Sequence, residues 1–194
     1  MLKDSFSEND DCPDWFRNFG WIRQINRSSS SAGVVRGCHA QTGRFCQGKL
    51  VSALTEKIYD VITDARPDSD TFGVSKVYIL DPATQNMLWV PRGFLHAFCV
   101  PLTAKSPALF EYFCDNVYDR GSETGVAPAS LLPKVAAGVS DMASTCGLSG
   151  YDDFINLFAS DLKFSDKDKA AADYKTWIGA AREKYEKTGK AWYR

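Results

Sequence analysis

The stretch VSKVYILDPATQNMLWVPRGFLHAFCV, residues 74–100, decides the fold of this chain. It holds short apolar runs at residues 74–80, 86–91 and 94–100, each bounded by Gly, Pro or Asn, and the run ALFEYFCD follows at 108–115. Short, evenly spaced runs of this kind, with no amphipathic helix between them, are typical of an antiparallel sandwich or barrel. The pattern predicts a mainly β domain and argues against an α/β fold.

The strand pattern extends outward from this stretch, from about residue 20 to residue 119. Upstream, KLVSALTEKIYDVITDA at residues 49–65 alternates apolar and polar residues, and Pro67, Asp68 and Ser69 then turn the chain. The serine run at residues 28–31 is expected to be a loop.

Helical spacing replaces the strand pattern after Asp119. The segments SLLPKVAAGVSDMAS and YDDFINLFASDL predict helices, with Ser149 or Asp152 as the N-cap of the second. The last 28 residues, from Lys167, predict an amphipathic helix that either packs on the barrel or makes an oligomer contact. Its apolar face carries Ala171, Tyr174, Trp177, Ile178, Ala181 and Tyr185.

Composition excludes several classes of protein. The 194 residues carry 23 Lys and Arg against 24 Asp and Glu, for a net charge of -1, and no basic block, which argues against a general nucleic-acid or anionic-membrane surface. No apolar run is long enough for a membrane span, and the acidic start MLKDSFSENDD is unlike a signal peptide. A cytoplasmic protein is expected, with its six cysteines kept as thiols.

Metal chemistry has few ligands available here. The chain has only two histidines, His39 and His96, and no CxxC pair, so a three-histidine site cannot be built. We expect no metal.

The segment GVVRGCHAQTGRFCQGKLV, residues 33–51, holds the first candidate for chemistry. On a strand, His39 shares a face with Gly37 and Gln41, whereas Arg36 faces the other way unless a bulge turns it. A histidine facing a small barrel's interior near Lys49 could be a general base beside a cation that stabilises an enolate. The alternative is a core histidine bonded to a backbone carbonyl.

Five motifs, taken together, indicate the function more specifically than this single segment does. The runs VVRGCHAQ, QGKLV, IYDVITDARPDSDTFG, LWVPRGFLHAFCV and EYFCDNVYDRGSE closely resemble, in order and spacing, the dTDP-4-dehydrorhamnose 3,5-epimerase family. Members of this family are cupin-type jelly-roll barrels. The resemblance implies such a barrel over residues 1–120 and a helical C-terminal extension, packed on the barrel, over residues 121–194.

The resemblance also implies a reaction, epimerisation of C3, C5 or both in a nucleotide-linked 4-keto-6-deoxy sugar. His39 resembles the family's base and Tyr112 its acid, and a tyrosine keeps its proton at neutral pH. Asp168, in FSDKD, resembles the aspartate that orients the base, with Asp60 as the fallback carboxylate. No cofactor is implied, because the substrate's own ketone accepts the electrons.

Substrate-binding residues follow by the same resemblance. Arg36 resembles the arginine that meets the diphosphate, and Lys49 the lysine near the sugar carbonyl. Gln24 and Asn26 resemble a pair that lines the sugar site, and His96 a second histidine near the sugar phosphate. Gln41, on the face of His39, completes the expected set. A homodimer is implied, because barrels of this family pair through their sheets.

Departures from the family lie at both ends of the barrel. MLKDSF resembles a segment that follows the family's first strand, so that strand and an arginine that crosses the dimer interface are expected to be missing. Asp4 or Ser5 stands where a glutamate is usual. The tyrosine segment has Phe113 and Val117 where the family has lysine and tyrosine.

Two other functions are compatible with a barrel of this kind. A cupin-type ketoisomerase would also use a histidine and an enolate, but Tyr112 and Lys49 in epimerase register argue against it. A catalytically inactive barrel would bind a sugar nucleotide or act as a structural or interaction module. If the C-terminal half supplies a partner surface, deleting residues 169–194 is expected to break an assembly and leave nucleotide binding intact.

Overall fold

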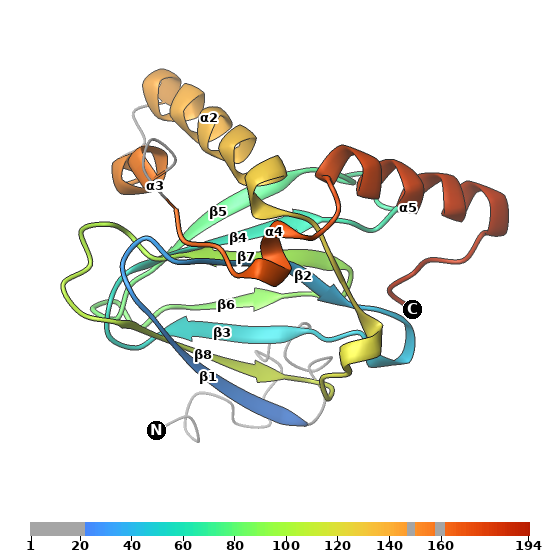
Figure 1. Ribbon diagram of the computed structural model, residues 1–194, viewed down its shortest axis with the longest axis horizontal. Coiled ribbons are helices and arrows are strands. Elements are labelled where there is room, and N and C mark those ends of the chain that lie inside the picture. The colour runs from blue at the N-terminus through green and yellow to red at the C-terminus, as the bar shows by residue number, and fades with distance from the viewer. Residues whose placement is uncertain (1–21, 147–149, 158–161) are drawn as a thin grey trace, which may run out of the picture.

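Two antiparallel sheets form the body of the protein in the computed structural model, which describes residues 22–146, 150–157 and 162–194 (Figure 1). The four-stranded sheet consists, in spatial order, of β1 (Gln24–Ser30), β8 (Ala108–Cys114), β3 (Lys49–Ala53) and β6 (Met87–Val90). The five-stranded sheet consists of β5 (Ser75–Leu80), β4 (Ile58–Asp64), β7 (Phe94–Cys99), β2 (Val35–Gln41) and β9 (Glu123–Gly125).

The topology is that of a jelly roll. Successive strands cross from one sheet to the other at every step except the β4–β5 hairpin, so strands that are distant in sequence become neighbours. The prediction of a mainly β, cupin-like jelly roll with C-terminal helices is confirmed. The helical elements between the strands are the short 3₁₀ turns Gly43–Phe45 and Arg120–Ser122.

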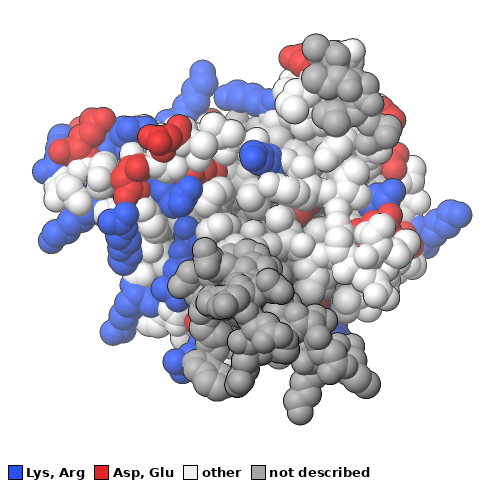
Figure 2. Space-filling model, turned by 180° about the vertical axis from the view of Figure 1, so that it is seen from behind, with Lys and Arg blue, Asp and Glu red and all other residues white. Residues whose placement is uncertain are grey.

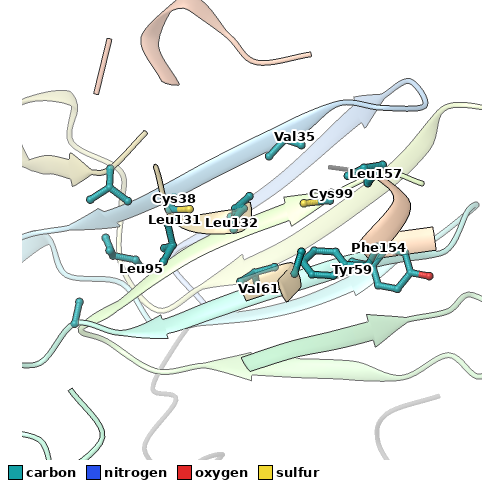
Figure 3. Packing of buried hydrophobic residues seen from close by; sticks show 14 of the residues in the cluster. Val35, Cys38, Tyr59, Val61, Leu95, Cys99, Leu131, Leu132, Phe154 and Leu157 are labelled. Carbon is teal, nitrogen blue, oxygen red and sulfur yellow. The ribbon is translucent and has the colours of Figure 1, made fainter. Parts of the chain in front are cut away.

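Apolar side chains fill two layers. One layer lies between the sheets and includes Val51, Ile58, Leu80, Val90, Phe98 and Phe110. The other lies between the outer face of the five-stranded sheet and the helices, where Leu131 and Leu132 of one helix and Phe154 and Leu157 of another meet Val35, Tyr59 and Val61 (Figure 3). Because both of its faces are covered, β4 is buried along its whole length. Asp60, within this strand, is fully buried.

The predicted helices are present, with one correction. They are α2 (Pro128–Cys146) and α3 (Asp152–Leu157), followed by α4 (Asp166–Lys169) and α5 (Tyr174–Thr188). The prediction of one helix from Lys167 was wrong, because the chain leaves helical geometry between α4 and α5. There Ala172 bridges to Val126, and the Asp173 side chain caps α5 by accepting from the amides of Lys175 and Thr176.

Other expectations are partly outside the described residues. Asp4, Ser5 and the MLKDSF segment lie there, as does Ser149, while Asp152 is the first residue of α3. The serine run is not a loop: Ser28–Ser30 are the end of β1, paired with β8. A domain boundary at residue 120 stays a prediction, since β9 continues the five-stranded sheet beyond that point.

The surface reflects the near-neutral charge of the chain. On the face shown in Figure 2, Lys and Arg side chains alternate with Asp and Glu over the side where α5 lies. Among the described residues, no helix has both the length and the apolar character that a membrane crossing requires.

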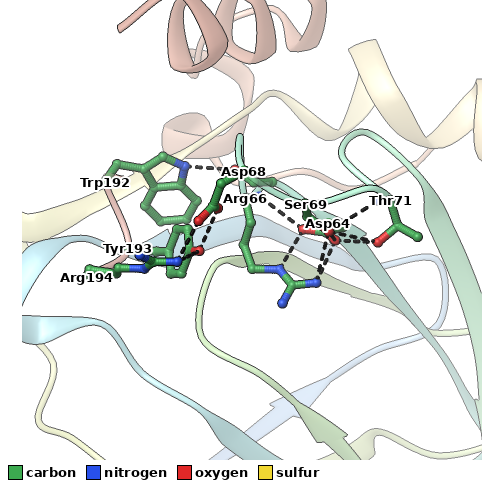
Figure 4. Close-up of polar contacts among 9 residues, drawn as sticks. Asp64, Arg66, Asp68, Ser69, Thr71, Trp192, Tyr193 and Arg194 are labelled. Atoms are coloured by element: carbon green, nitrogen blue, oxygen red, sulfur yellow. Dashed lines mark hydrogen bonds and ion pairs between the residues drawn. The ribbon is translucent and has the colours of Figure 1, made fainter. Parts of the chain in front are cut away.

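A cluster of hydrogen bonds around one buried carboxylate, Asp64, fixes the loop after β4. Asp64, only 1% exposed, accepts hydrogen bonds from the Arg66 guanidinium at 2.7 and 2.9 Å and from the hydroxyls of Ser69 and Thr71, each at 2.6 Å (Figure 4). Burial alone would raise the pKa of Asp64, but these donors lower it to about 2. The cluster therefore holds Asp64 ionised.

We expect Asp64→Asn to lower the free energy of unfolding at pH 7 by about 2 kcal/mol. A carboxyl group with a depressed folded-state pKa stabilises the protein above its unfolded pKa of about 4 and loses that contribution as the pH falls toward 2. Urea denaturation at pH 7 and at several values below 4 measures the difference, with the exposed Asp70→Asn of the same loop as control. A destabilisation that does not shrink on acidification would contradict the prediction.

Candidate active site

A polar cavity of about 390 Å³ lies between the two sheets. The four-stranded sheet contributes side chains from β1, β3 and β8, the five-stranded sheet from β2, β7 and β9, and α4 contributes from the C-terminal segment. Its lining includes every residue predicted for the site except Asp60: Gln24, Asn26, Arg36, His39, Gln41, Lys49, His96, Tyr112 and Asp168.

His39 is paired with a carboxylate. Its Nε2 lies 2.7 Å from Oδ1 of Asp168, which is almost completely buried and comes from α4. Ser165, the N-cap of α4, donates from its hydroxyl to the other oxygen of Asp168 at 2.7 Å and accepts from the Asp168 amide. Burial alone would raise the pKa of Asp168, but the contacts with His39 and Ser165 lower it below its ordinary value. Asp168 is thus an ionised partner for the imidazole.

A register shift in β2 brings Arg36 to the same cavity. Strict alternation would point Arg36 and His39 to opposite faces, but the pairing of β2 with β7 shifts between these two residues. Both side chains line the cavity as a result. The Arg36 side chain is held by its Nε, which donates to the Ser30 hydroxyl at 2.9 Å.

The second nitrogen of His39 faces another carboxylate. Its Nδ1 lies 3.4 Å from Oε1 of Glu123, on β9, too far for a strong hydrogen bond. Lys167 forms an ion pair with Glu123, and the Tyr118 hydroxyl donates to it at 2.5 Å, which raises the pKa of Tyr118 to about 12. Burial would raise the pKa of Glu123, yet these partners lower it. Nδ1 of His39 therefore has the negative charge of the Glu123 carboxylate beside it.

Tyr112 stands on the opposite sheet. It belongs to β8, where it pairs with Val51 on one side and with Asn26 on the other. Burial raises the pKa of its hydroxyl, so it holds its proton more firmly than an exposed tyrosine. His39 and Tyr112 thus approach the cavity from different sheets, one able to take a proton and the other to give one.

Lys49 and a second histidine, His96, also line the cavity. Burial lowers the pKa of Lys49, which is partly offset by Cys114 and the carboxylates of Asp60 and Glu123. His96 Nε2 lies 2.8 Å from Asp60, a fully buried residue of β4. Asp60 therefore pairs with His96 and not with His39, and it is not itself part of the cavity lining.

The side-chain amides of Gln24 and Gln41 hold the loop that follows β8. The carbonyl oxygen of Gln24 accepts from the Tyr118 amide at 2.7 Å, and that of Gln41 accepts from the Asp119 amide at 2.9 Å. The amide nitrogen of Gln24 donates to Asn26 at 2.7 Å. These residues line the cavity and also place the loop that carries Tyr118.

Sequence reasoning missed Glu123, Tyr118 and Gln47, which also line the cavity. Glu123 is the last residue of the run EYFCDNVYDRGSE, so the motif itself was the signal that could have found it. Within the described part of the chain, no group of three or more His, Cys, Asp or Glu side chains is arranged to hold a metal ion.

Comparisons with known proteins point to one family. The family model for dTDP-4-dehydrorhamnose 3,5-epimerase matches residues 12–175. The Shigella flexneri protein of that name is 39% identical over 103 residues, which is 53% of this chain and 55% of the relative. The Salmonella typhimurium protein is 36% identical over 124 residues, 59% of this chain and 66% of the relative. The chain therefore spans less than two thirds of these relatives.

Solved structures of epimerases also resemble this chain. A crystal structure of dTDP-4-dehydrorhamnose 3,5-epimerase from Elizabethkingia anophelis superposes with a TM-score of 0.63 at 33% identity, covering 80% of this chain and 74% of that one. The Legionella pneumophila dTDP-6-deoxy-D-glucose-3,5-epimerase, solved in complex with dTDP-4-keto-L-rhamnose, has a TM-score of 0.60 at 31% identity and covers 79% and 70%.

Proposed function

Because this chain belongs to the dTDP-4-dehydrorhamnose 3,5-epimerase family, we propose that it inverts C3, C5 or both in a nucleotide-linked 4-keto-6-deoxy sugar. The observation that carries the proposal is the placement of His39 and Tyr112 on opposite sheets across one cavity. Inversion needs a base on one face of a carbon atom and an acid on the other, and this pair supplies both. An inactive module would have no use for such a pair.

The reaction starts at a carbon beside the C4 ketone. Nδ1 of His39 removes the proton, and the electron pair of the broken C–H bond moves into the ring so that the C4 oxygen becomes an enolate. Asp168 at Nε2 stabilises the imidazolium that forms. The charge of Lys49 stabilises the enolate oxygen.

The second half of the reaction restores the ketone and gives the carbon beside it the opposite configuration. Electrons return from the enolate, and the carbon takes a proton from the Tyr112 hydroxyl on its other face, which forms the new C–H bond. Solvent then returns a proton to Tyr112 and takes one from His39. The substrate's own carbonyl is the electron acceptor throughout, so the proposed chemistry uses no cofactor.

Binding of the nucleotide diphosphate is proposed at Arg36, in the lining of the cavity. Arg36 has the charge and the forked donors that suit diphosphate oxygens. Gln24, Asn26 and His96 line the same cavity and offer donors and acceptors to the sugar. The Legionella structure was solved with dTDP-4-keto-L-rhamnose, which supports dTDP as the nucleotide.

Incubation with dTDP-4-keto-6-deoxyglucose in deuterated water tests the function. We expect deuterium to enter C3, C5 or both, as followed by NMR. Incorporation at both positions identifies a two-centre epimerase, and incorporation at one position a single-centre enzyme. Binding of the compound without exchange would overturn the proposal in favour of the inactive sugar-nucleotide-binding barrel.

We also propose a cytoplasmic homodimer. The described cysteines Cys38, Cys46, Cys99 and Cys114 are all free thiols, which supports a reducing compartment. The outer face of the four-stranded sheet carries an apolar row across its strands, in which Ile25 pairs with Phe113, Phe113 with Leu50 and Leu50 with Trp89. Ile25 is 59% exposed, so this row offers a surface to a second copy.

The double substitution Ile25→Glu with Phe113→Glu is expected to dissociate the dimer, because it would bring like charges together at a two-fold interface. Sedimentation equilibrium measures the mass of each protein. The control is Leu102→Glu, at an apolar residue 46% exposed outside the row. A monomeric wild type, or equal dissociation by the control, would contradict the assignment of this face.

A further inference from the structure

The placement of Glu123 depends on a very short element. β9 is three residues long and forms the edge of its sheet, paired only with β2, where Gly125 faces His39 and Thr124 faces Ala40. An edge strand of this length has little stability of its own. Lys167 and Tyr118 hold the carboxylate of Glu123 from the cavity side. The backbone of β9, which sets the place of Glu123 beside Nδ1 of His39, also has a contact on its other side.

Thr124 provides that contact. Successive strand residues face opposite ways, so Glu123 lines the active-site cavity while Thr124 lines a second, smaller cavity behind the strand. There the indole N–H of Trp177, from α5, donates to the Thr124 hydroxyl at 2.9 Å. This bond joins the C-terminal helix to the strand that carries Glu123.

Trp177 is itself held in place. Its ring meets the ring of Trp192 edge to face, with centroids 5.6 Å apart. The chain turns back after α5 so that the Trp192 carbonyl accepts from the Gly43 amide, and the Trp192 indole donates to the Ala65 carbonyl at 2.8 Å (Figure 1). The start of α5 is fixed too, because the Ala127 amide donates to the Ala172 carbonyl directly after β9.

We propose that Trp177 is a positioning residue of the active site, which holds Glu123 beside His39 through its hydrogen bond to Thr124. The predicted effect of Trp177 on turnover rests on the proposed epimerase function. The predicted effect of Trp177 on the position of Glu123 does not. Loss of the indole N–H frees β9 to move, and the carboxylate next to the reactive nitrogen moves with it. Binding of the nucleotide is unaffected, because Trp177 and Thr124 do not line that cavity.

Two variants remove the same hydrogen bond from its two ends. Trp177→Phe keeps an aromatic ring and loses the N–H, and Thr124→Val keeps the branched shape and loses the hydroxyl. Each is expected to lower kcat by about tenfold with KM unchanged, because small displacements of a catalytic constellation are costly. The double variant is expected to have the same kcat as either single variant, because both substitutions remove the same hydrogen bond. Thr124→Ser, which keeps the hydroxyl, is expected to retain the wild-type kcat.

A second readout needs no substrate. The chain has two histidines, so the ring signals of His39 are assigned in NMR spectra by comparison with His96→Asn. We expect the His39 signals to shift in Trp177→Phe and Thr124→Val. The control is Trp192→Phe, which loses the matching indole N–H from the other ring of the pair, bonded to Ala65 away from the site.

Three outcomes decide the proposal. Shifted His39 signals in both variants, with none in the control, support the placement even if the wild type fails to epimerise, in which case only the proposed function falls. Unchanged His39 signals in Trp177→Phe and Thr124→Val overturn it. Equal shifts and equal loss of kcat in Trp192→Phe also overturn it, because general loosening of the C-terminal segment would then explain the effect.

Discussion

Replacing His39 with asparagine is expected to lower kcat by a factor of about 10² to 10⁴, the range that a positioned general base contributes. Asparagine keeps a hydrogen-bond donor for Asp168, which lies 2.7 Å from the histidine ring, so the surrounding structure is preserved. It has no group that accepts a proton at neutral pH. Deuterium incorporation at C3 and C5, followed by NMR in deuterated water, measures the loss directly.

Two controls accompany the His39 variant. Calorimetric titration with dTDP should give a Kd within a few-fold of wild type, because the diphosphate is proposed to bind at Arg36 and not at the imidazole. Thermal unfolding should show that the variant is folded. Exchange at the wild-type rate in a folded variant would show that another group takes the proton, and His96, with Asp60 behind it, would be the next candidate.

Tyr112→Phe is expected to separate proton exchange from inversion. His39 remains on its own sheet and can still remove a proton and return a solvent deuteron to the same face of the carbon, so exchange continues. Inversion requires delivery from the opposite face, where phenylalanine has no proton to give. Formation of the inverted product should therefore fall by about 10² to 10⁴, the contribution of a positioned general acid.

A single reaction measures both quantities for Tyr112→Phe. Mass spectrometry of the recovered sugar nucleotide gives the deuterium content, and the proton couplings of the ring give the configuration at C3 and C5. Deuterated starting material with little inverted product is the expected result. Equal losses of exchange and inversion would mean that Tyr112 acts before proton removal, and unchanged inversion would mean that another group is the acid.

Local pattern predicted much of this fold because strand and turn signals act over short distances. The apolar runs between residues 74 and 115 correspond to β5, β6, β7 and β8, because side-chain alternation and flanking turn residues are local properties of the chain. The same reasoning failed at Ser28–Ser30. Serine is a common turn residue, but pairing with β8 holds these three in a strand.

The helical end of the chain shows the same limit. Spacing at three and four residues correctly indicated an apolar helix face, with Trp177 and Ile178 packed on the core. It could not show that the segment from Lys167 is two helices. The break exists because Ala172 pairs with Val126, more than forty residues earlier, and no pattern within the segment reports that contact.

The sequence by itself determined which chemical groups are available: two histidines, their neighbouring lysine and tyrosine, and a set of carboxylates in recognisable motifs. Only the tertiary structure decided how they pair. Asp168 meets His39 and Asp60 meets His96, although Asp60 is far closer to His39 in sequence. The physical reason is that a jelly roll sends successive strands to opposite sheets, so proximity at the site is set by strand pairing, the shift in β2 and the return of α4, and not by distance along the chain.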